Sequence, residues 1–376
     1  MRVEPPVPGP ALSKMRAALA KAGATPVDAP ILQPLNLLLD LAGEAMRASL
    51  FVVQAEGDAE ACLRPDFTAA VARRHIESGA AAGRYVYEGP AFRSAPQADR
   101  PEEFLQLGLE LFATGASPTL DADAEVASLT WATAAAGGRD DLILWLGDVG
   151  LFSAFIQSLD LPKALAARLT RVAGRPRLLN AELARAGAAP AAVPKRGQLA
   201  AMLSGLTEAE AGAMLEEVWT LSGVEPVGGR SPREIAARLV RQAEAAHAPA
   251  LTRAQAQAIR AFLAISEAPA AGLAKVRTLT GKAKRLEAAL DDWDTRLARL
   301  AGIPRDRMRF APALGHAFDY YDGMTLEIRS EALGADRPVA SGGRYDGLLA
   351  RLGGPADARA VGCSIRPWRA FAGGEA

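Results

Sequence analysis

The sequence predicts an α+β fold in which an antiparallel sheet is flanked by helices and carries a helical insertion. Residues 103–112 and 324–328 alternate apolar and polar side chains, which is the period of a half-buried strand. The insertion is predicted from three helix-start signals in which Ser or Thr is followed three residues later by Glu or Gln. These capping boxes lie at residues 207–210, 231–234 and 252–255.

Length and composition limit the class of protein. A chain of 376 residues, 50% of them hydrophobic, can form two or three compact units with a large core. The 43 basic and 43 acidic residues cancel, so neither nucleic acid nor an acidic membrane is an expected partner. Cys62 and Cys363 fit no metal or redox spacing, which favours a reduced cytoplasmic protein without metal or other cofactor. No apolar run reaches membrane-spanning length.

Along the chain, a proline-rich arm at residues 1–10 precedes a first sheet region. Pro65 fits the first turn of a helix that continues to about Ile76, and Gly89-Pro90 is expected to bend a strand at 85–93. The other expected helices are 11–23, 35–41, 121–136 and 279–300, and the other expected strands are 27–32, 51–53, 308–313 and 360–365. The predicted domains are 1–160 and 271–376, which form one sheet domain, and the helical insertion 161–270.

Two stretches carry polar side chains where a pocket could form. Strict alternation places Gln106 and Glu110 on one face of the strand 103–112, and such a face needs water or a ligand over it. The alternative is a half-exposed sheet whose polar face is solvated. The segment 318–323 and the glycine-rich segment 341–347 suggest a pocket wall. Their alternative is an ordinary hairpin with Tyr320 and Tyr321 on opposite faces.

The segments resemble class II histidyl-tRNA synthetases, in the same order, from about residue 23 to 369. The family's Leu-Arg-Pro-Glu-Gly-Thr corresponds to Leu-Arg-Pro-Asp-Phe-Thr at 63–68. Its motif 2 corresponds to Gly-Pro-Ala-Phe-Arg at 89–93 and Phe-Leu-Gln-Leu-Gly-Leu-Glu at 104–110. Its histidine motif, Arg-Gly-Leu-Asp-Tyr-Tyr-x-Gly, corresponds to 316–323, and its Gly-Gly-Arg-Tyr-Asp-Gly-Leu to 342–348.

The resemblance implies a pocket for histidine, since a carboxylate and a phenol can satisfy both nitrogens of an imidazole ring. The residues carried over are Asp66 and Thr68 for the amino group, Arg93 and Gln106 beside the carboxylate, and Glu110, Tyr321 and Tyr320 for the imidazole.

The departures from the family pattern affect the machinery for ATP. His316 stands where the family has the arginine that holds the reacting phosphate, and it lacks the bidentate fork and the permanent charge of that arginine. After its motif 2 arginine the family has a glutamate that reads adenine, whereas here Arg93 is followed by Ser94-Ala95, and Arg366 would crowd the place of ATP. The anticodon-binding domain is absent from the sequence. The chain is therefore expected to have no catalytic residues.

This combination resembles the regulatory subunits of ATP phosphoribosyltransferase. Such a paralogue pairs with a short catalytic subunit in the first step of histidine biosynthesis and senses histidine for feedback inhibition. The resemblance implies a homodimer within a larger hetero-oligomer, with a dimer face near Pro30. The alternative is a truncated histidyl-tRNA synthetase or a related amino-acid-activating enzyme.

Overall fold

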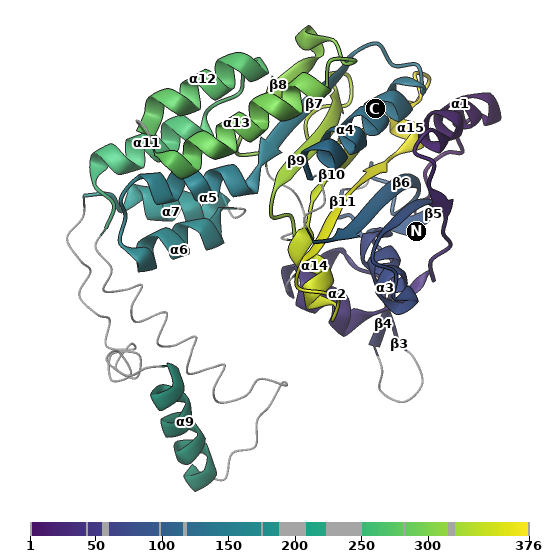
Figure 1. The fold of residues 1–376 in the computed structure, drawn as a ribbon. Coiled ribbons are helices and arrows are strands. Elements are labelled where there is room, and N and C mark those ends of the chain that lie inside the picture. Colours follow the sequence, from purple (N-terminus) through teal and green to yellow (C-terminus); the bar gives the residue numbers. More distant parts are fainter. Residues whose placement is uncertain are drawn as a thin grey trace. The chain divides into compact units, whose positions relative to one another are not determined.

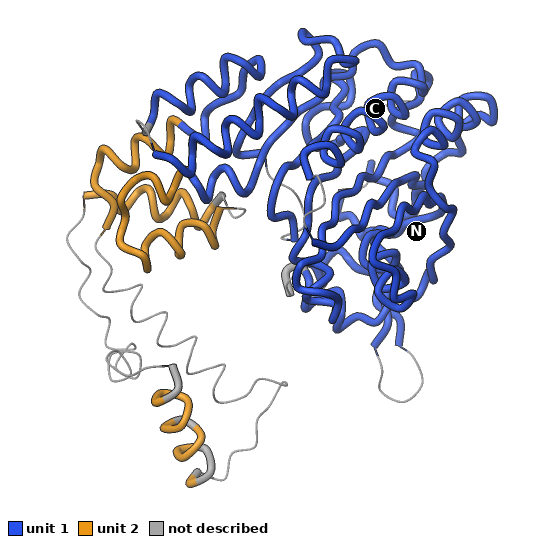
Figure 2. The backbone as a smooth tube through the Cα atoms, viewed as in Figure 1, with its two compact units in different colours: residues 1–154, 262–376 blue, residues 155–261 orange. Residues whose placement is uncertain are grey.

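The structure of the chain is a computed structural model, and Figure 1 shows its fold. The structure describes residues 2–42, 44–54, 60–97, 99–115, 119–173, 176–187, 208–222, 250–280, 283–314 and 320–374. The chain forms two compact units, one of residues 1–154 and 262–376 and the other of residues 155–261 (Figure 2). The assignment of residues 161–270 as an inserted domain stays a prediction.

The first unit is built on an eight-stranded sheet with the order β1-β5-β6-β11-β10-β9-β7-β8. The strands are β1 Thr25–Pro26, β5 Gly83–Phe92, β6 Glu103–Thr114, β7 Leu142–Asp148, β8 Met308–Phe310, β9 Met324–Ser330, β10 Ala340–Arg344 and β11 Ala358–Ile365. The five inner pairings are antiparallel, and the pairs at the two edges, β1 with β5 and β7 with β8, are parallel. The predicted α+β fold with a mostly antiparallel sheet is confirmed.

Helices pack on both faces of this sheet. Helix α4, Thr119–Ala135, contacts β9, β10 and β11, whereas α3, Thr68–Ser78, contacts β6 and α14, Asp346–Arg351 (Figure 1). Other helices that begin in this unit are α1 Gly9–Ala20, α2 Leu35–Ala42, α5 Val149–Ser158, α12 Pro269–Thr280, α13 Lys284–Arg299 and α15 Pro367–Ala370. Two 3-10 turns also belong to it, η1 Glu44–Ser49 and η4 Arg305–Arg307. A small antiparallel sheet has the order β2-β4-β3, with β2 Leu32–Pro34, β3 Val52–Gln54 and β4 Glu60–Leu63.

Several local expectations are wrong in detail. Helix α3 begins at Thr68, so Pro65 lies before the helix and not in its first turn. Strand β5 continues through Gly89-Pro90, because both residues stay in register with β6. The expected strand 27–32 falls between β1 and β2, and β7 was not predicted at all.

Strand β6 is buried on both faces along most of its length. Leu107 and Leu109 lie in the core, and Gln106 and Glu110 on the opposite face are only 2% and 1% exposed. The alternative of a solvated polar face is therefore wrong. A carboxyl group buried in this way needs partners within the protein or from a ligand.

A buried ion network fixes the β10 strand that leads into the site. Asp123 on α4 accepts hydrogen bonds from Arg344 Nη2 at 2.6 Å and from Arg296 Nε at 2.7 Å. Arg344 also pairs with Asp346 at 2.8 Å, and its carbonyl accepts the backbone N–H of Asp322 at 3.0 Å. The network joins α4, α13 and β10 to the segment that precedes β9.

The second unit is helical in its described part. Its helices are α6 Lys163–Val172, α7 Pro176–Ala184, α9 Glu208–Ser222 and α11 Arg253–Leu263. The capping box at 252–255 is confirmed, because Gln255 N donates to Thr252 Oγ1 at 3.1 Å and Thr252 N donates to Gln255 Oε1 at 3.0 Å. Thr207 and residues 231–234, which belong to the other two predicted boxes, lie outside the described residues.

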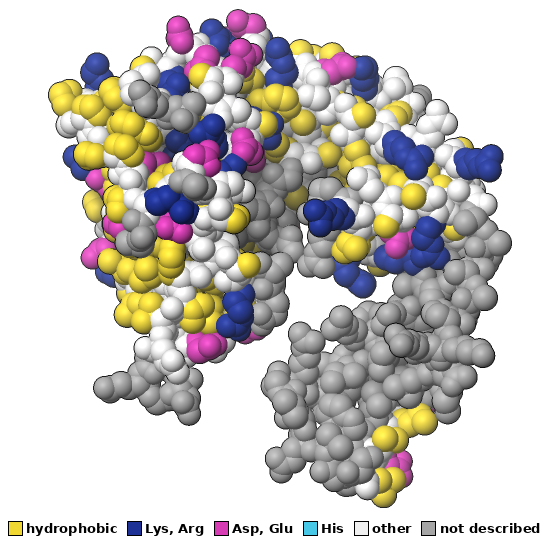
Figure 3. Space-filling view, turned by 180° about the vertical axis from the view of Figure 1, so that it is seen from behind, with side chains coloured by type: hydrophobic (Ala, Val, Ile, Leu, Met, Phe, Trp, Pro, Cys, Tyr) yellow, Lys and Arg dark blue, Asp and Glu magenta, His cyan; other side chains and the backbone are white. Residues whose placement is uncertain are grey.

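Charged side chains of both signs are interspersed with apolar ones on the face drawn in Figure 3. This distribution is in keeping with the equal numbers of acidic and basic residues in the sequence. Among the described helices none is long and apolar enough to cross a membrane.

Candidate functional site

A cavity of about 410 Å³ lies in the first unit. Residues from the segment before α3, the connection between β5 and β6, and strands β9 to β11 contribute to its wall. Five of the seven predicted site residues line it: Asp66, Thr68, Arg93, Tyr320 and Tyr321. Gln106 and Glu110 are not among the residues that line it, but the Glu110 carboxyl directly adjoins Thr68, Tyr345 and Gly362, which are.

Glu110 is bonded to two side chains of the cavity wall. Thr68 Oγ1 donates to one carboxyl oxygen of Glu110 at 2.7 Å, and the Tyr345 hydroxyl donates to the other. Gly362 on β11 lies opposite Glu110 in the sheet and also lines the cavity. A Cβ at this glycine would collide with the Glu110 carboxyl, so only glycine leaves the carboxyl room. The carboxyl therefore sits directly beneath the wall.

Burial controls the charge of this carboxyl. Desolvation raises the pKa of Glu110 to about 8, although the hydrogen bonds from Tyr345 and Thr68 act in the opposite direction. At neutral pH the protonated form of this carboxyl is therefore favoured as long as no ligand pairs with it. A ligand that brings an N–H group or a positive charge would favour the ionised form.

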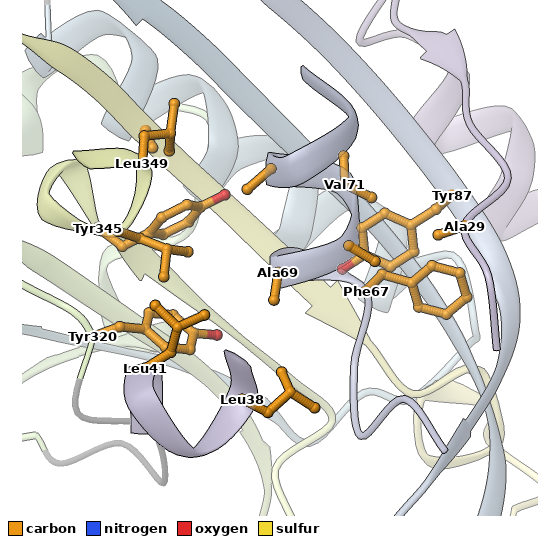
Figure 4. Packing of buried hydrophobic residues seen from close by; sticks show 14 of the residues in the cluster. Ala29, Leu38, Leu41, Phe67, Ala69, Val71, Tyr87, Tyr320, Tyr345 and Leu349 are labelled. Atoms are coloured by element: carbon orange, nitrogen blue, oxygen red, sulfur yellow. The ribbon is translucent and has the colours of Figure 1, made fainter. Parts of the chain in front are cut away.

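Three tyrosines enclose the same region. The ring of Tyr320 lies 4.8 Å from that of Tyr321 and 5.7 Å from that of Tyr345, between centroids. Figure 4 shows Tyr320 and Tyr345 within the hydrophobic cluster that also contains Ala69 of α3. Both adjacent tyrosines face the cavity, so the hairpin alternative with one of them in solvent is wrong. Burial raises the pKa of the Tyr321 phenol, which stays a neutral donor.

Tyr345 was missed as a site residue by the sequence reasoning. It follows Arg344 in the glycine-rich segment that was already predicted to form a pocket wall, and that position was the available signal. In the structure it supplies the hydroxyl that holds Glu110. Residues 315–319 of the neighbouring tyrosine stretch, which include His316 and Phe318, lie outside the described residues.

Opposite charges meet at another part of the wall. Arg93 Nη2 lies 3.9 Å from Asp66 Oδ2, and Arg93 Nε donates to the Pro65 carbonyl at 2.9 Å. Burial raises the pKa of Asp66, and the nearby Arg93 opposes that shift. A carboxylate beside a guanidinium can receive an ammonium and a carboxylate from one amino acid. Gln106, on the face of β6 that carries Glu110, keeps its Oε1 without a hydrogen-bond partner in the described chain.

An arginine, Arg366, lines the cavity beside Phe104, which lies near the start of β6. The Arg366 guanidinium lies over the ring of Phe104, 3.4 Å from its centroid, and pairs with Glu4 at 2.5 Å. Burial, together with Arg369 and Arg93 nearby, lowers the pKa of Arg366 to about 9, and Glu4 counters this effect. The described residues contain no group of His, Cys, Asp and Glu that could hold a metal ion.

Comparisons with known proteins agree on the family. The histidyl-tRNA synthetase family profile matches residues 11–222 and 230–369. The ATP phosphoribosyltransferase regulatory subunit of Mesorhizobium japonicum is 35% identical over 349 residues, which cover 90% of each chain. That of Sinorhizobium medicae is 36% identical over 349 residues, again 90% of each chain.

Solved structures show the same fold. The structure described as an ATP phosphoribosyltransferase regulatory subunit/histidyl-tRNA synthetase from Bacillus halodurans C aligns with a TM-score of 0.63 and 20% identity, covering 97% of this chain and 78% of that one. Histidyl-tRNA synthetase from Nostoc sp. PCC 7120 aligns with a TM-score of 0.60 and 18% identity, covering 96% and 69%. The chain therefore belongs to the ATP phosphoribosyltransferase regulatory subunits, the non-catalytic paralogues of histidyl-tRNA synthetase in histidine biosynthesis.

Proposed function

We propose that this regulatory subunit binds L-histidine in the 410 Å³ cavity and conveys feedback inhibition to a short-form catalytic subunit of ATP phosphoribosyltransferase. The observation that carries the proposal is the buried Glu110, held by Thr68 and Tyr345 beneath the cavity wall. An imidazole N–H can donate to this carboxyl, and a tyrosine hydroxyl can donate to the second ring nitrogen. The cavity volume lies within the usual range for small-molecule sites.

The main-chain groups of histidine would lie at the charged part of the wall. Asp66 and Thr68 would bind the ammonium group, and Arg93 would bind the carboxylate with Gln106 beside it. The proximity of Arg93 to Asp66, 3.9 Å, supports this arrangement because one amino acid carries both complementary charges.

A second candidate is a truncated amino-acid-activating enzyme, which the match to the histidyl-tRNA synthetase profile favours. Against it stands the cavity end where Arg366 covers Phe104. Phosphoryl and adenylyl transfer depends on room for the nucleotide and on positioned positive charge around the phosphates. Histidine-dependent pyrophosphate exchange would distinguish this enzyme from a regulatory subunit.

The proposed assembly is a cytoplasmic homodimer within a larger hetero-oligomer, without nucleic acid or membrane. The small sheet near Pro30 supports a dimer face, because Leu32, Val52 and Val53 expose apolar side chains there. Closed two-fold dimers are the commonest homo-oligomers. Light scattering of the purified chain, alone and with the catalytic subunit, measures both steps. A monomer at micromolar concentration that does not change on adding the catalytic subunit would contradict the assembly.

The function is tested by reconstituting the complex with the short catalytic subunit. ATP phosphoribosyltransferase activity is measured against histidine concentration, and histidine binding to the isolated regulatory chain is measured by calorimetry. We expect binding to the isolated chain and inhibition in the same concentration range. Inhibition without any binding to the isolated chain would place the histidine site elsewhere in the complex.

A further inference from the structure

The arm formed by residues 2–8 is attached to the rim of the cavity. Glu4 N donates to the Glu103 carbonyl at 2.8 Å, and Glu102 N donates to the Arg2 carbonyl at 2.7 Å. The Arg2 side chain donates to the carbonyls of Arg100 at 2.7 Å and Ala95 at 2.6 Å. The arm thus forms a single parallel bridge with the start of β6 and contacts the connection between β5 and β6, which lines the cavity.

Glu4, a residue of this arm, forms a buried ion pair with Arg366 of the cavity wall. The Glu4 side chain is 3% exposed and the Arg366 side chain 12%. Glu4 Oε2 and Arg366 Nε have no hydrogen-bond partner in the described part of the chain. A buried ion pair with an unsatisfied atom on each side adds little stability, because desolvation offsets the attraction. Stability alone therefore does not explain the pair.

The groups that this pair covers are those that a nucleotide would use. The face of Phe104 under the Arg366 guanidinium is a surface on which a purine could stack. Arg93, Arg100 and Arg369 line the same cavity, and guanidinium groups bind phosphate oxygens. The Arg366 guanidinium lies where the purine would stack on Phe104, and the Glu4 carboxylate pairs with that guanidinium in place of a phosphate.

We propose that the arm is a built-in occupant of this end of the cavity, in which Glu4 holds Arg366 on Phe104 and so excludes purine nucleotides. The remaining space then accepts a ligand of amino-acid size. Specificity arises here from a residue pair that blocks the competitor, not from an added contact to the ligand.

Two variants of the full-length chain test the proposal with AMP and inorganic phosphate as probes. Glu4→Gln removes the internal anion and leaves a buried cation, so it should bind both probes about tenfold or more tightly than wild type. Arg366→Ala uncovers Phe104 and should gain affinity for AMP but not for phosphate. Glu88→Gln is the matched control, because Glu88 forms an ion pair with Arg16 on the exposed part of β5 and does not line the cavity.

Binding is measured by equilibrium dialysis at low salt, with histidine titrated into the same samples and the melting temperature recorded. The proposal fails if both variants fold normally and bind AMP no more tightly than wild type. If Glu4→Gln is unfolded, Arg366→Ala decides the question alone. If no sample binds histidine, wild type included, the proposed histidine site is wrong. The comparison of AMP affinity between wild type and the variants still tests the role of the arm.

Discussion

Replacing Glu110 with alanine tests the proposed imidazole contact. The carboxyl is 1% exposed and already accepts hydrogen bonds from Thr68 at 2.7 Å and from Tyr345, so a bound imidazole N–H would be its next donor. A hydrogen bond to a charged group contributes about 1.5–3 kcal/mol. Its loss should raise the Kd for histidine by about one to two orders of magnitude.

The same substitution affects stability, which has to be measured separately. Alanine leaves the hydroxyls of Thr68 and Tyr345 without their acceptor, at a cost of about 1–3 kcal/mol each. Glu110→Gln is the control, because it retains one acceptor oxygen in nearly the same shape but has no ionised form. Its loss of histidine affinity should be smaller than that of Glu110→Ala.

The assay is the activity of the reconstituted ATP phosphoribosyltransferase complex against histidine concentration. Inhibition requires that histidine bind one state of the complex better than another, so weaker binding moves the curve to higher histidine. Uninhibited activity and assembly should stay near wild type. Identical inhibition curves for wild type and Glu110→Ala would refute the assignment of the histidine site.

Four further predictions follow from the same geometry. Histidine affinity should rise with pH through about 6.5, where the free imidazole loses its proton, and on through about pH 8, where Glu110 ionises, because the proposed contact joins a neutral imidazole to an ionised carboxyl; a flat profile of Kd against pH would contradict this. The raised pKa of Glu110 means that this group ionises first in the unfolded chain, so its contribution to the free energy of unfolding should fall as pH rises from about 4.5 to about 8, and Glu110→Gln should make the slope in urea titrations less steep. Purified protein should show no histidine-dependent pyrophosphate exchange, and exchange well above background would support the enzyme instead. Asp123→Asn should lower the free energy of unfolding by about 3–5 kcal/mol because it breaks a buried ion network. The control is Asp121→Asn, which should cost less than about 1 kcal/mol because the Asp121 side chain is 55% exposed where it pairs with Arg299. Equal losses in the two variants would count against the network.

Local periodicity was enough to predict the strand that carries Glu110. The alternation over residues 103–112 placed Gln106 and Glu110 on one face, and β6 has this arrangement. The same pattern could not tell a solvated face from a buried one. That outcome depends on α3, which packs against β6, and on Tyr345, which bonds to Glu110, and both contacts join segments far apart in the sequence.

Strand β7 illustrates the opposite case. Its residues 142–146 read as a continuous apolar run, because the strand is buried in the sheet interior and has no polar face to alternate with. Such a run does not by itself distinguish a buried strand from a helix segment. Its place between β8 and β9 follows from pairing with residues more than a hundred positions away.

The candidate site was predicted from resemblance more than from pattern. Asp66, Thr68 and Arg93 were found because short motifs contain them, and the structure brings them to one cavity. Tyr345 lies in such a motif too, but its bond to Glu110 spans 235 positions, and no local feature specifies that contact.

The Glu4–Arg366 pair beside Phe104 could not be predicted from local sequence patterns. The proline-rich composition of the arm predicts an extended segment, and that segment then pairs through its backbone with residues 102 and 103 at the start of β6. Backbone pairing fixes where Glu4 falls, so its partner is set by the register of the arm and not by any pattern around Arg366, 362 positions later. Arg366 in the sequence indicates only that a nucleotide would be crowded. The structure adds the reason that the guanidinium stays in place, since Glu4 neutralises it and Phe104 supports it. The proposed exclusion of nucleotides and the proposed binding of histidine therefore depend on different residues, so we expect that the two properties can be lost separately.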